Sequence, residues 1–202
     1  MKTNQYTLKQ AQADLHSDAW SKLVPIYTPF INGWLRQCGI VENDIPDLTQ
    51  DVLIALVKKL PEFDHNGRTG AFRNWLKAIT VNHCRRYWDS KKKAFPISNT
   101  QAANLFIEQL ADSSSNLSMR WNREHDQEVL NGIIRMIQGE FDSATMTAFR
   151  RVALNREPAK AIAKDLNVSV GQIYKFKFRV MRRLQEEAKV LIDSTDDLPL
   201  VA

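Results

Sequence analysis

Apolar side chains recur every three to four residues along most of the chain, which is the spacing of one helix face, and no segment alternates as a strand would. Pro25 and Pro29 lie within the first such segment. A proline fits only the first turn of a helix, so we expect a kink or a break there, with Gly39 ending the segment. The pattern predicts an all-α protein with helices over residues 18–37, 44–60, 72–93, 126–138 and 143–154, a short helix over 102–110, and two helices within 158–184.

Residues 158–184 carry the most specific pattern, which is two helices joined by a tight turn. Asn167 tolerates the left-handed conformation that such a turn requires, and Ser169 can cap the second helix. Apolar residues stand at the offsets that would fill a shared core, at Ile162, Leu166, Val168, Ile173 and Phe176. This pattern is typical of a DNA-reading helix-turn-helix.

The second helix of this pair has two distinct faces when residues are placed about 100 degrees apart. Its apolar stripe consists of Ile173, Phe176, Val180 and Leu184. Its opposite face consists of Gly171, Lys175, Phe178, Arg179 and Arg182. The plain alternative for that face is a solvated helix surface. Phe178 argues against it, because solvent gives a phenyl ring nothing to bind, whereas a major groove offers thymine methyl groups.

Charge is segregated along the 202 residues, whose net charge is +5 and whose pI is about 9.2. Residues 150–183 hold ten basic side chains and two acidic ones, and residues 68–93 hold eight basic ones and one acidic one. Residues 40–66 hold six acidic side chains and two basic ones. The basic segments suggest a polyanion as a partner.

The composition bounds the class of protein. A hydrophobic content of 44% is enough for packed cores, and the longest apolar run, over residues 52–57, is too short to span a bilayer. The first residues lack the apolar stretch of a signal peptide, so we expect a cytoplasmic protein. Cys38 and Cys84 show no metal-ligand spacing, so we expect two reduced thiols, no metal site and no cofactor.

Catalysis is not expected. His83 and Cys84 are adjacent, but a catalytic pair would need an orienting third group that the sequence does not show. A nuclease that uses His83 and nearby acids is the weakest of the alternatives. The sequence therefore predicts a protein that is not an enzyme.

The predicted helix over residues 44–60 also has two faces. Leu48, Val52, Ala55 and Leu56 group on one side. The other side holds Asp47, Gln50, Asp51, Ile54 and Lys58. Carboxylates, an amide and an aliphatic side chain together suit an interface with a basic protein. The plain alternative is that acids favour a helix N-terminus, which alone would explain Asp44 and Asp47.

A polar loop precedes the next predicted helix and contains Asp64, His65, Asn66, Gly67, Arg68, Thr69 and Gly70. In that helix, Phe72, Trp75, Leu76 and Ile79 are expected to pack inward. Arg73, Lys77 and Arg85 are expected to face outward, with Tyr87 and Trp88 following among basic residues. Aromatic and amide side chains on a basic surface suit single-stranded nucleic acid.

The chain divides into segments by composition. Residues 1–93 form a first domain, residues 94–124 a flexible linker containing Pro96 and a run of serines, and residues 125–192 a second domain. The acidic tail over residues 193–202 is expected to be disordered. The fold predicted from the sequence is two small helical domains joined by a flexible linker.

Several motifs, in their order and at their separations, resemble those of bacterial sigma factors of the extracytoplasmic-function group. The resemblance covers about residues 19–191. The matching pieces are Asp47-Leu48-Thr49-Gln50-Asp51-Val52, Phe63-Asp64, Phe72-Arg73-Asn74-Trp75-Leu76 with Ile79 and Asn82, Ile162-Ala163, and Val168-Ser169-Val170-Gly171. The resemblance implies that the first domain is sigma region 2 and the second is region 4, with no separate region 3 between them.

The resemblance also implies roles for the matched positions. Binding to core RNA polymerase would fall to Asp47, Leu48, Gln50, Asp51 and Ile54. Binding and melting of the −10 element would fall to Asp64, His65, Asn66, Arg68, Arg73, Asn74, Lys77, Asn82, Arg85 and Arg86. Recognition of the duplex −35 element would fall to Ser169, Gln172, Tyr174, Lys175, Lys177, Phe178, Arg179, Arg182 and Arg183. Family members are often held by an anti-sigma protein, a further partner for which the sequence itself gives no sign.

The chain departs from the family pattern at three places. Asn167 stands where glycine is common, Tyr174 where a small or basic residue is common, and Pro25 within a helix. Because of Tyr174, the family pattern does not predict which base sequence this chain would recognise in the −35 element. The alternative function is a DNA-binding regulator that reads an operator through the same helix-turn-helix and never binds polymerase. That alternative leaves the acidic face and the basic aromatic helix unexplained.

Overall fold

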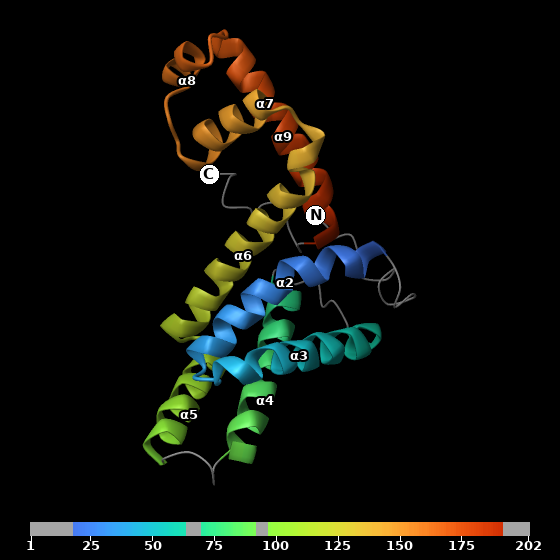
Figure 1. Cartoon of the computed structure of the whole chain (residues 1–202), viewed down its shortest axis with the longest axis vertical. Helices are drawn as coiled ribbons and strands as arrows, with labels where there is room; N and C mark the ends of the chain where they lie inside the picture. Colours follow the sequence, from blue (N-terminus) through green and yellow to red (C-terminus); the bar gives the residue numbers. More distant parts are fainter. Residues whose placement is uncertain (1–17, 64–69, 92–96, 192–202) are drawn as a thin grey trace.

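The computed structural model describes residues 18–63, 70–91 and 97–191, and within these ranges it contains helices and no strand. The fold class is all-α, as predicted. The N-terminal elements are α2 (Asp18–Gln37), η1 (Glu42–Asp44), α3 (Ile45–Lys59), η2 (Leu60–Glu62) and α4 (Ala71–Lys91). They are followed by α5 (Ile97–Ala111), α6 (Asn116–Ile137) and η3 (Gln138–Glu140). The C-terminal elements are α7 (Ser143–Phe149), η4 (Arg150–Leu154), α8 (Ala159–Asp165) and α9 (Val170–Leu191). The helices α2 to α5 gather around one half of α6, whereas α9 runs beside its other end and α7 and α8 lie beyond it (Figure 1).

Helix α2 runs through Pro25 and Pro29 as one element, so of the expected kink or break, a break does not occur. Both prolines are exposed, whereas Ile26, Tyr27 and Phe30 on the other face are buried. Packing of this apolar face against α3, α4 and α6 offsets the backbone hydrogen bonds that the prolines cannot make.

Gly39 follows α2 with a φ of +76°, which confirms it as the end of the segment. A Cβ atom there would lie 3.3 Å from the Trp88 ring, so the position needs glycine for its space as well as for its conformation. Trp88 Nε1 also donates to the Cys38 carbonyl at 2.9 Å. The end of α2 is thereby fixed to α4.

The segment that the sequence suggested as a flexible linker is helical and packed over its described residues. Helix α5 spans Ile97–Ala111, and α6 begins at Asn116, ten residues earlier than expected. Ser115 caps α6, because its Oγ accepts a hydrogen bond from the Ser118 backbone N–H at 2.9 Å. The serine run thus provides a helix start rather than a flexible chain.

Helix α6 contributes to the packing of both halves of the molecule. Near its start, the fully buried Trp121 packs against Phe30 and Trp34 of α2, with ring centroids 4.7 and 4.9 Å apart. Farther along, a Cβ atom at Gly132 would lie 2.5 Å from Ile26, so glycine permits a close approach of α6 to α2. The last residues of α6 pack against α9, with buried side chains at Leu130, Ile133, Ile134 and Ile137.

The two helices expected within residues 158–184 are present as α8 and α9, and a tight turn joins them. Asn167 has a φ of +53°, and Ser169 Oγ accepts from the Gln172 N–H at 3.1 Å. A small core cluster consists of Ala148, Ile162, Ala163, Ile173 and Phe176. The helix expected over residues 143–154 is regular only to Phe149 and ends in a π-helical turn over Arg150–Leu154.

Two apolar clusters make up the core in the described residues. The larger one runs from Leu23 of α2 through α6 to Val180 and Leu184 of α9, and the smaller one is the cluster under the helix-turn-helix. The boundary between the clusters therefore falls across α9, and it does not coincide with the domain boundaries predicted from the sequence. None of the described helices has the length and apolar character needed to cross a membrane.

Candidate interfaces for protein and nucleic acid

The predicted polymerase-binding face lies on the outer side of α3. Val52 and Leu56 are fully buried, while Asp47, Gln50, Asp51 and Ile54 are exposed. Ile54 is 41% exposed, which leaves an aliphatic side chain among the carboxylates. Leu48 is half-buried and packs against the core, so of the five predicted residues it contributes least to the outer surface.

Asp44 serves the fold rather than this face. Its Oδ2 accepts from Tyr87 Oη at 2.8 Å and lies 3.1 Å from Lys91 Nζ. The hydrogen bond from Tyr87, followed by that from Lys91, lowers the pKa of Asp44. Asp44, at the start of α3, therefore holds the end of α4 in place. The carboxylates of α3 that face outward are those of Asp47 and Asp51.

The predicted −10 loop lies outside the described residues. Its predicted contact residues Asp64, His65, Asn66 and Arg68 belong to this part of the chain. Gly70 has a φ of +78°, and a Cβ there would lie 2.6 Å from the Arg73 guanidinium. Its lack of a side chain gives Arg73 room at the start of α4.

Four of the six predicted −10 residues on α4 are exposed, namely Asn74, Asn82, Arg85 and Arg86. Trp75 is half-buried and packs against Phe63, with ring centroids 4.8 Å apart, which supports its expected place in the core. These exposed amide and guanidinium groups can bind phosphates and base edges.

The other two predicted −10 residues do not face outward, and that expectation is corrected. Lys77 is only 6% exposed and donates to Ser118 Oγ of α6. Arg73 Nη1 donates to Asp126 Oδ2 at 2.8 Å, and its side chain is 17% exposed. Burial, and then the charge of Arg73, lowers the pKa of Lys77. The sequence spacing placed both on the outer face of α4, but both are bound to side chains of α6, Arg73 to Asp126 and Lys77 to Ser118.

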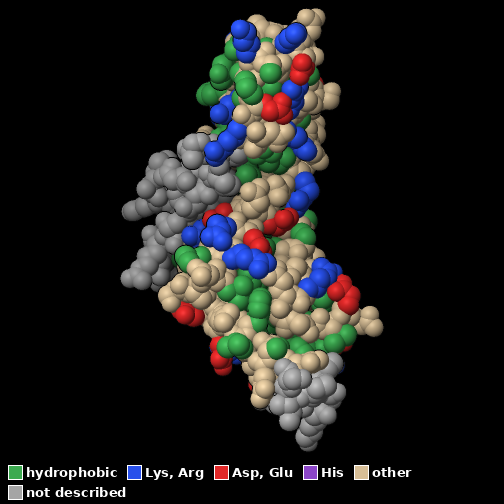
Figure 2. All heavy atoms as spheres, turned by 90° about the vertical axis from the view of Figure 1, so that its left-hand side faces the viewer, with side chains coloured by type: hydrophobic (Ala, Val, Ile, Leu, Met, Phe, Trp, Pro, Cys, Tyr) green, Lys and Arg blue, Asp and Glu red, His purple; other side chains and the backbone are tan. Residues whose placement is uncertain are grey.

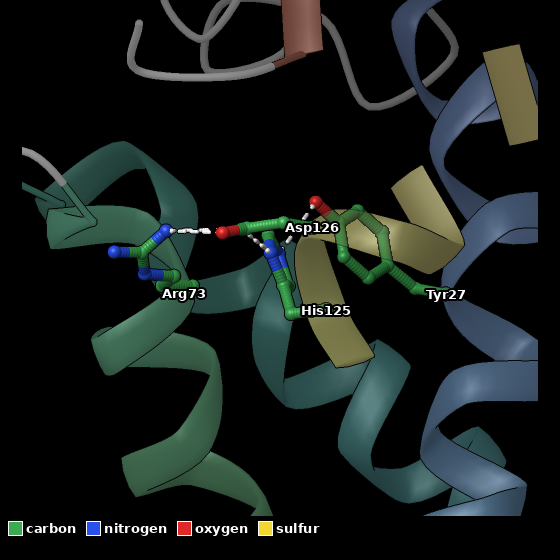
Figure 3. Close-up of polar contacts among 4 residues, drawn as sticks. All are labelled: Tyr27, Arg73, His125 and Asp126. Carbon is green, nitrogen blue, oxygen red and sulfur yellow. Dashed lines mark hydrogen bonds and ion pairs between the residues drawn. The ribbon is translucent and has the colours of Figure 1, made fainter. Parts of the chain in front are cut away.

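A polar chain that no local sequence pattern indicated holds this contact in place. Tyr27 Oη lies 3.3 Å from His125 Nε2, His125 Nδ1 lies 3.0 Å from Asp126 Oδ1, and Asp126 in turn binds Arg73 (Figure 3). The adjacent His125 and Asp126 were visible in the sequence only as the start of a predicted helix. Their partners are 98 and 53 residues away, so no local pattern indicated them.

The two cysteines lie together although they are far apart in the sequence. Both are free and fully buried. A hydrogen bond between the two thiols, followed by burial, raises the pKa of Cys84. The neighbouring His83 is half-buried, and burial followed by the charge of Arg86 lowers its pKa. Within the described ranges, no three His, Cys, Asp or Glu side chains gather closely enough to hold a metal ion.

The outer face of α9 keeps its predicted character. Phe178 is 66% and Tyr174 57% exposed, and Lys175, Arg179 and Arg182 are exposed beside them. The Arg179 guanidinium lies 5.8 Å from the Phe141 ring centroid, a cation–π contact that holds it against the turn after α6. Gln172 and Lys177 are half-buried, and Ser169 is used as the cap.

Arg183 is the exception on α9. Its guanidinium binds Glu140 at 2.7 and 2.9 Å and Glu187 at 2.6 Å. These hydrogen bonds, the one to Glu140 first, raise its pKa. A guanidinium held by two carboxylates is not available to a phosphate, so the predicted phosphate contact is not supported in this state. Arg183 connects α9 to η3 instead.

Several basic residues are similarly paired, which moderates the strong positive charge counted in the sequence. Arg151 binds Glu157 and Asp165, at 2.7 and 2.8 Å, and Arg182 lies 3.3 Å from Glu186. Basic and acidic side chains are interspersed over the face drawn in Figure 2. The DNA-binding capacity therefore depends on individual helix faces and not on one large basic surface.

Comparison with protein families identifies the N-terminal part. Residues 12–94 match the model of sigma-70 region 2. This segment is similar to sigma-70 region 2, and the match supports a sigma factor family. The match contains α2, α3 and α4, and thus the acidic face and the exposed residues of α4. A region 2 domain indicates a sigma factor role, with binding to RNA polymerase and promoter melting. The comparison with curated proteins gives no match.

Proposed function

We propose that the chain is a sigma factor of the extracytoplasmic-function group, which binds core RNA polymerase in the cytoplasm and directs it to promoters. The observation that carries the proposal is that one chain joins a region 2 domain to a helix-turn-helix with a basic, aromatic outer face. In this proposal residues 1–93 act as region 2 and residues 125–192 as region 4.

The proposed polymerase contact is the outer face of α3. Asp47 and Asp51 supply negative charge, Gln50 supplies hydrogen bonds, and the exposed Ile54 supplies apolar area. Charges steer the encounter with a basic partner, whereas a central aliphatic side chain contributes to affinity once water is excluded. Leu48 packs against the core beneath this face.

The proposed contact with the melted −10 strand is the exposed side of α4 together with the loop before it. Arg85 and Arg86 attract the backbone, and Asn74 and Asn82 offer hydrogen bonds to bases. Flipping a base out of the duplex costs on the order of a few kcal/mol, which contacts to the flipped base must offset. We assign that capture to the loop with Asp64, His65, Asn66 and Arg68.

The proposed reader of the duplex −35 element is α9. Tyr174, Lys175, Phe178 and Arg179 are placed to meet base edges in the major groove, and Lys177 and Arg182 to meet phosphates. The exposure of two aromatic side chains on this face supports contact with DNA, because it would be unfavourable in water alone.

The decisive experiment is reconstitution with core RNA polymerase. We expect the purified chain to bind core polymerase and to confer start-site choice on a genomic DNA library. Asp51→Arg should abolish the association in a pull-down and leave the circular dichroism spectrum unchanged. Glu108→Arg, which makes the same charge change at an exposed position of α5, is the matched control and should bind like the wild type.

The same experiment addresses the alternative function. A chain that binds specific duplex DNA but not core polymerase would be a regulator of the helix-turn-helix class. Equal binding by the wild type and Asp51→Arg would remove α3 from the interface.

A further inference from the structure

The turn between α6 and α7 contacts two arginines that are one helical turn apart on α9. Arg183 donates to Glu140 at 2.7 and 2.9 Å and to Glu187 at 2.6 Å. The Arg179 guanidinium lies over the Phe141 ring, 5.8 Å from its centroid. Glu140 and Phe141 thus hold neighbouring cations in different ways, the first through a carboxylate and the second through the face of a ring.

The two kinds of contact leave the two guanidinium groups with different capacities for binding. The carboxylates occupy N–H donors of Arg183, whereas an aromatic face attracts a cation through its quadrupole and takes up no donor. Within the described part of the chain, the Arg179 guanidinium makes no hydrogen bond or ion pair, and the residue is exposed. Among the described residues, then, nothing competes for the five N–H donors of Arg179.

Arg179 also lies beside the proposed base contacts of α9. An open groove of about 440 Å³ separates the turn from α9, and its lining includes Phe141, Phe178, Arg179 and Arg182. Phe178, which is 66% exposed, is one of the proposed base contacts, and Arg179 is the next residue of the helix. Phe141 thus meets Arg179 at the edge of the face that would enter the major groove.

Phe141 is itself held in place by the fold. It is half-buried and packs against the larger core cluster, and its backbone N–H donates to the Gln138 carbonyl at 3.4 Å. The next residue, Asp142, caps α7 by accepting from the Thr145 backbone N–H at 2.7 Å. That hydrogen bond is the main cause of the lowered pKa of Asp142, to which the charge of Arg179 adds. A ring that is fixed on both sides can restrict a long side chain that would otherwise sample many rotamers.

We propose that Phe141 is a positioning residue for base recognition, which holds the Arg179 guanidinium so that two of its N–H groups meet a guanine in the −35 element. Phe141 itself does not contact the DNA. The inference rests on the proposed sigma factor function. A guanidinium can donate to both O6 and N7 of guanine, which is the commonest specific contact in the major groove. This paired contact requires one orientation of the guanidinium, and the ring provides it before DNA is bound.

Sequence selection with the full chain tests the assignment. A randomised duplex library is bound to the wild type, to Phe141→Leu and to Arg179→Ala, and the retained DNA is sequenced. We expect the wild type to retain guanine at one position where neither variant does, while the preferences at all other positions persist. Leucine keeps an apolar side chain in the half-buried site but lacks the ring face. Phe141→Tyr keeps the ring face and should select like the wild type.

A double-mutant cycle separates positioning from support of the fold. The probe is the duplex that the wild type selects, and the readout is fluorescence anisotropy. Phe141→Leu should weaken binding about 2- to 5-fold, the range expected for one exposed cation–π contact. In an Arg179→Ala background the same substitution should leave the affinity unchanged. A merely structural role of Phe141 would weaken binding equally in both backgrounds, because the loss would not depend on Arg179.

Phe106→Leu is the matched control, since Phe106 is also half-buried against the same core cluster but lies on α5. It should keep the selection and the affinity of the wild type. If Phe141→Leu still selects guanine at the position that Arg179→Ala loses, or weakens binding equally in both backgrounds, the proposal is overturned. Should Phe141→Leu not fold, Phe141→Met, which fills the site without a ring, carries the same prediction. A wild type that selects no sequence would instead refute the proposed −35 reading, and the inference with it.

Discussion

Lys77 is a charged residue in surroundings that suit its methylene groups better than its ammonium group. It lies beneath α6 with Ser118 Oγ as a hydrogen-bond partner, and the like charge of Arg73 is close by. Burial of an ammonium group beside a like charge is unfavourable, and the charge of Asp112 offsets it only in part. The buried ammonium group of Lys77 therefore lowers the stability of the fold.

Replacement of this lysine should stabilise the fold. We expect Lys77→Met to raise the free energy of unfolding by about 1 kcal/mol at pH 7, because it keeps the packing and removes the buried charge. The gain should shrink as the pH rises toward 10.5. The folded pKa of Lys77 lies below its value of 10.5 in the unfolded chain, so the unfolded state binds more protons there and the wild type becomes more stable with pH. Urea unfolding at several pH values measures this, and a difference that does not change with pH would contradict it.

For single residues, the sequence correctly predicts a role that depends on neighbours in the chain. Asn167 and Ser169 were predicted correctly because a left-handed turn and a helix cap depend on local chemistry. Lys77 and Arg183 were placed on the wrong surface, because their environment is set by Ser118 and Glu140, which lie 41 and 43 residues away. Helical spacing alone cannot show which other helix covers a face.

Among the elements, α9 and α6 illustrate the same limit. The apolar stripe of α9 is strongly periodic, and its four residues are indeed buried. Helix α6 begins ten residues before its predicted start, because the serine run looked flexible while Ser115 in fact caps the helix. The buried Trp121 was the available signal, since it continues the apolar face of Val129 two turns earlier.

The exposed aromatic side chains of α9 lead to a prediction about base recognition. If Phe178 packs on a thymine methyl group in the −35 element, substitution of deoxyuridine for that thymidine removes one methyl and should weaken binding about fourfold, the equivalent of about 0.8 kcal/mol. The Phe178→Ala variant should bind both DNAs equally. Fluorescence anisotropy with matched duplexes measures the difference.

A control on the same face separates base contacts from phosphate contacts. Arg182→Ala should weaken binding to every sequence alike and keep the difference between thymidine and deoxyuridine, because a phosphate contact carries no sequence information. If Phe178→Ala still distinguishes the two duplexes, the phenyl ring does not read the methyl group.

For the whole molecule, the arrangement of the cores matters more than the division into domains. One apolar cluster extends from α2 through α6 to Val180 and Leu184 of α9, and only the five residues under the helix-turn-helix form a separate cluster. The sequence indicated two halves with different chemistry, and the region 2 match agrees with the first of them. The sequence could not show that α6 packs with both halves, because Trp121 contacts residues of α2 that are about 90 positions away.

This arrangement predicts how damage to each cluster spreads through the molecule. Trp121→Ala removes a fully buried ring from the larger cluster and should cost about 3 to 5 kcal/mol, with faster amide exchange in α2 as well as in α6. Phe176→Ala removes a ring of the smaller cluster and should speed exchange only in α8 and the first half of α9. Hydrogen–deuterium exchange with mass spectrometry resolves these segments. If Trp121→Ala left amide exchange in α2 unchanged, the packing of α6 against α2 would not contribute to the stability of α2 in solution.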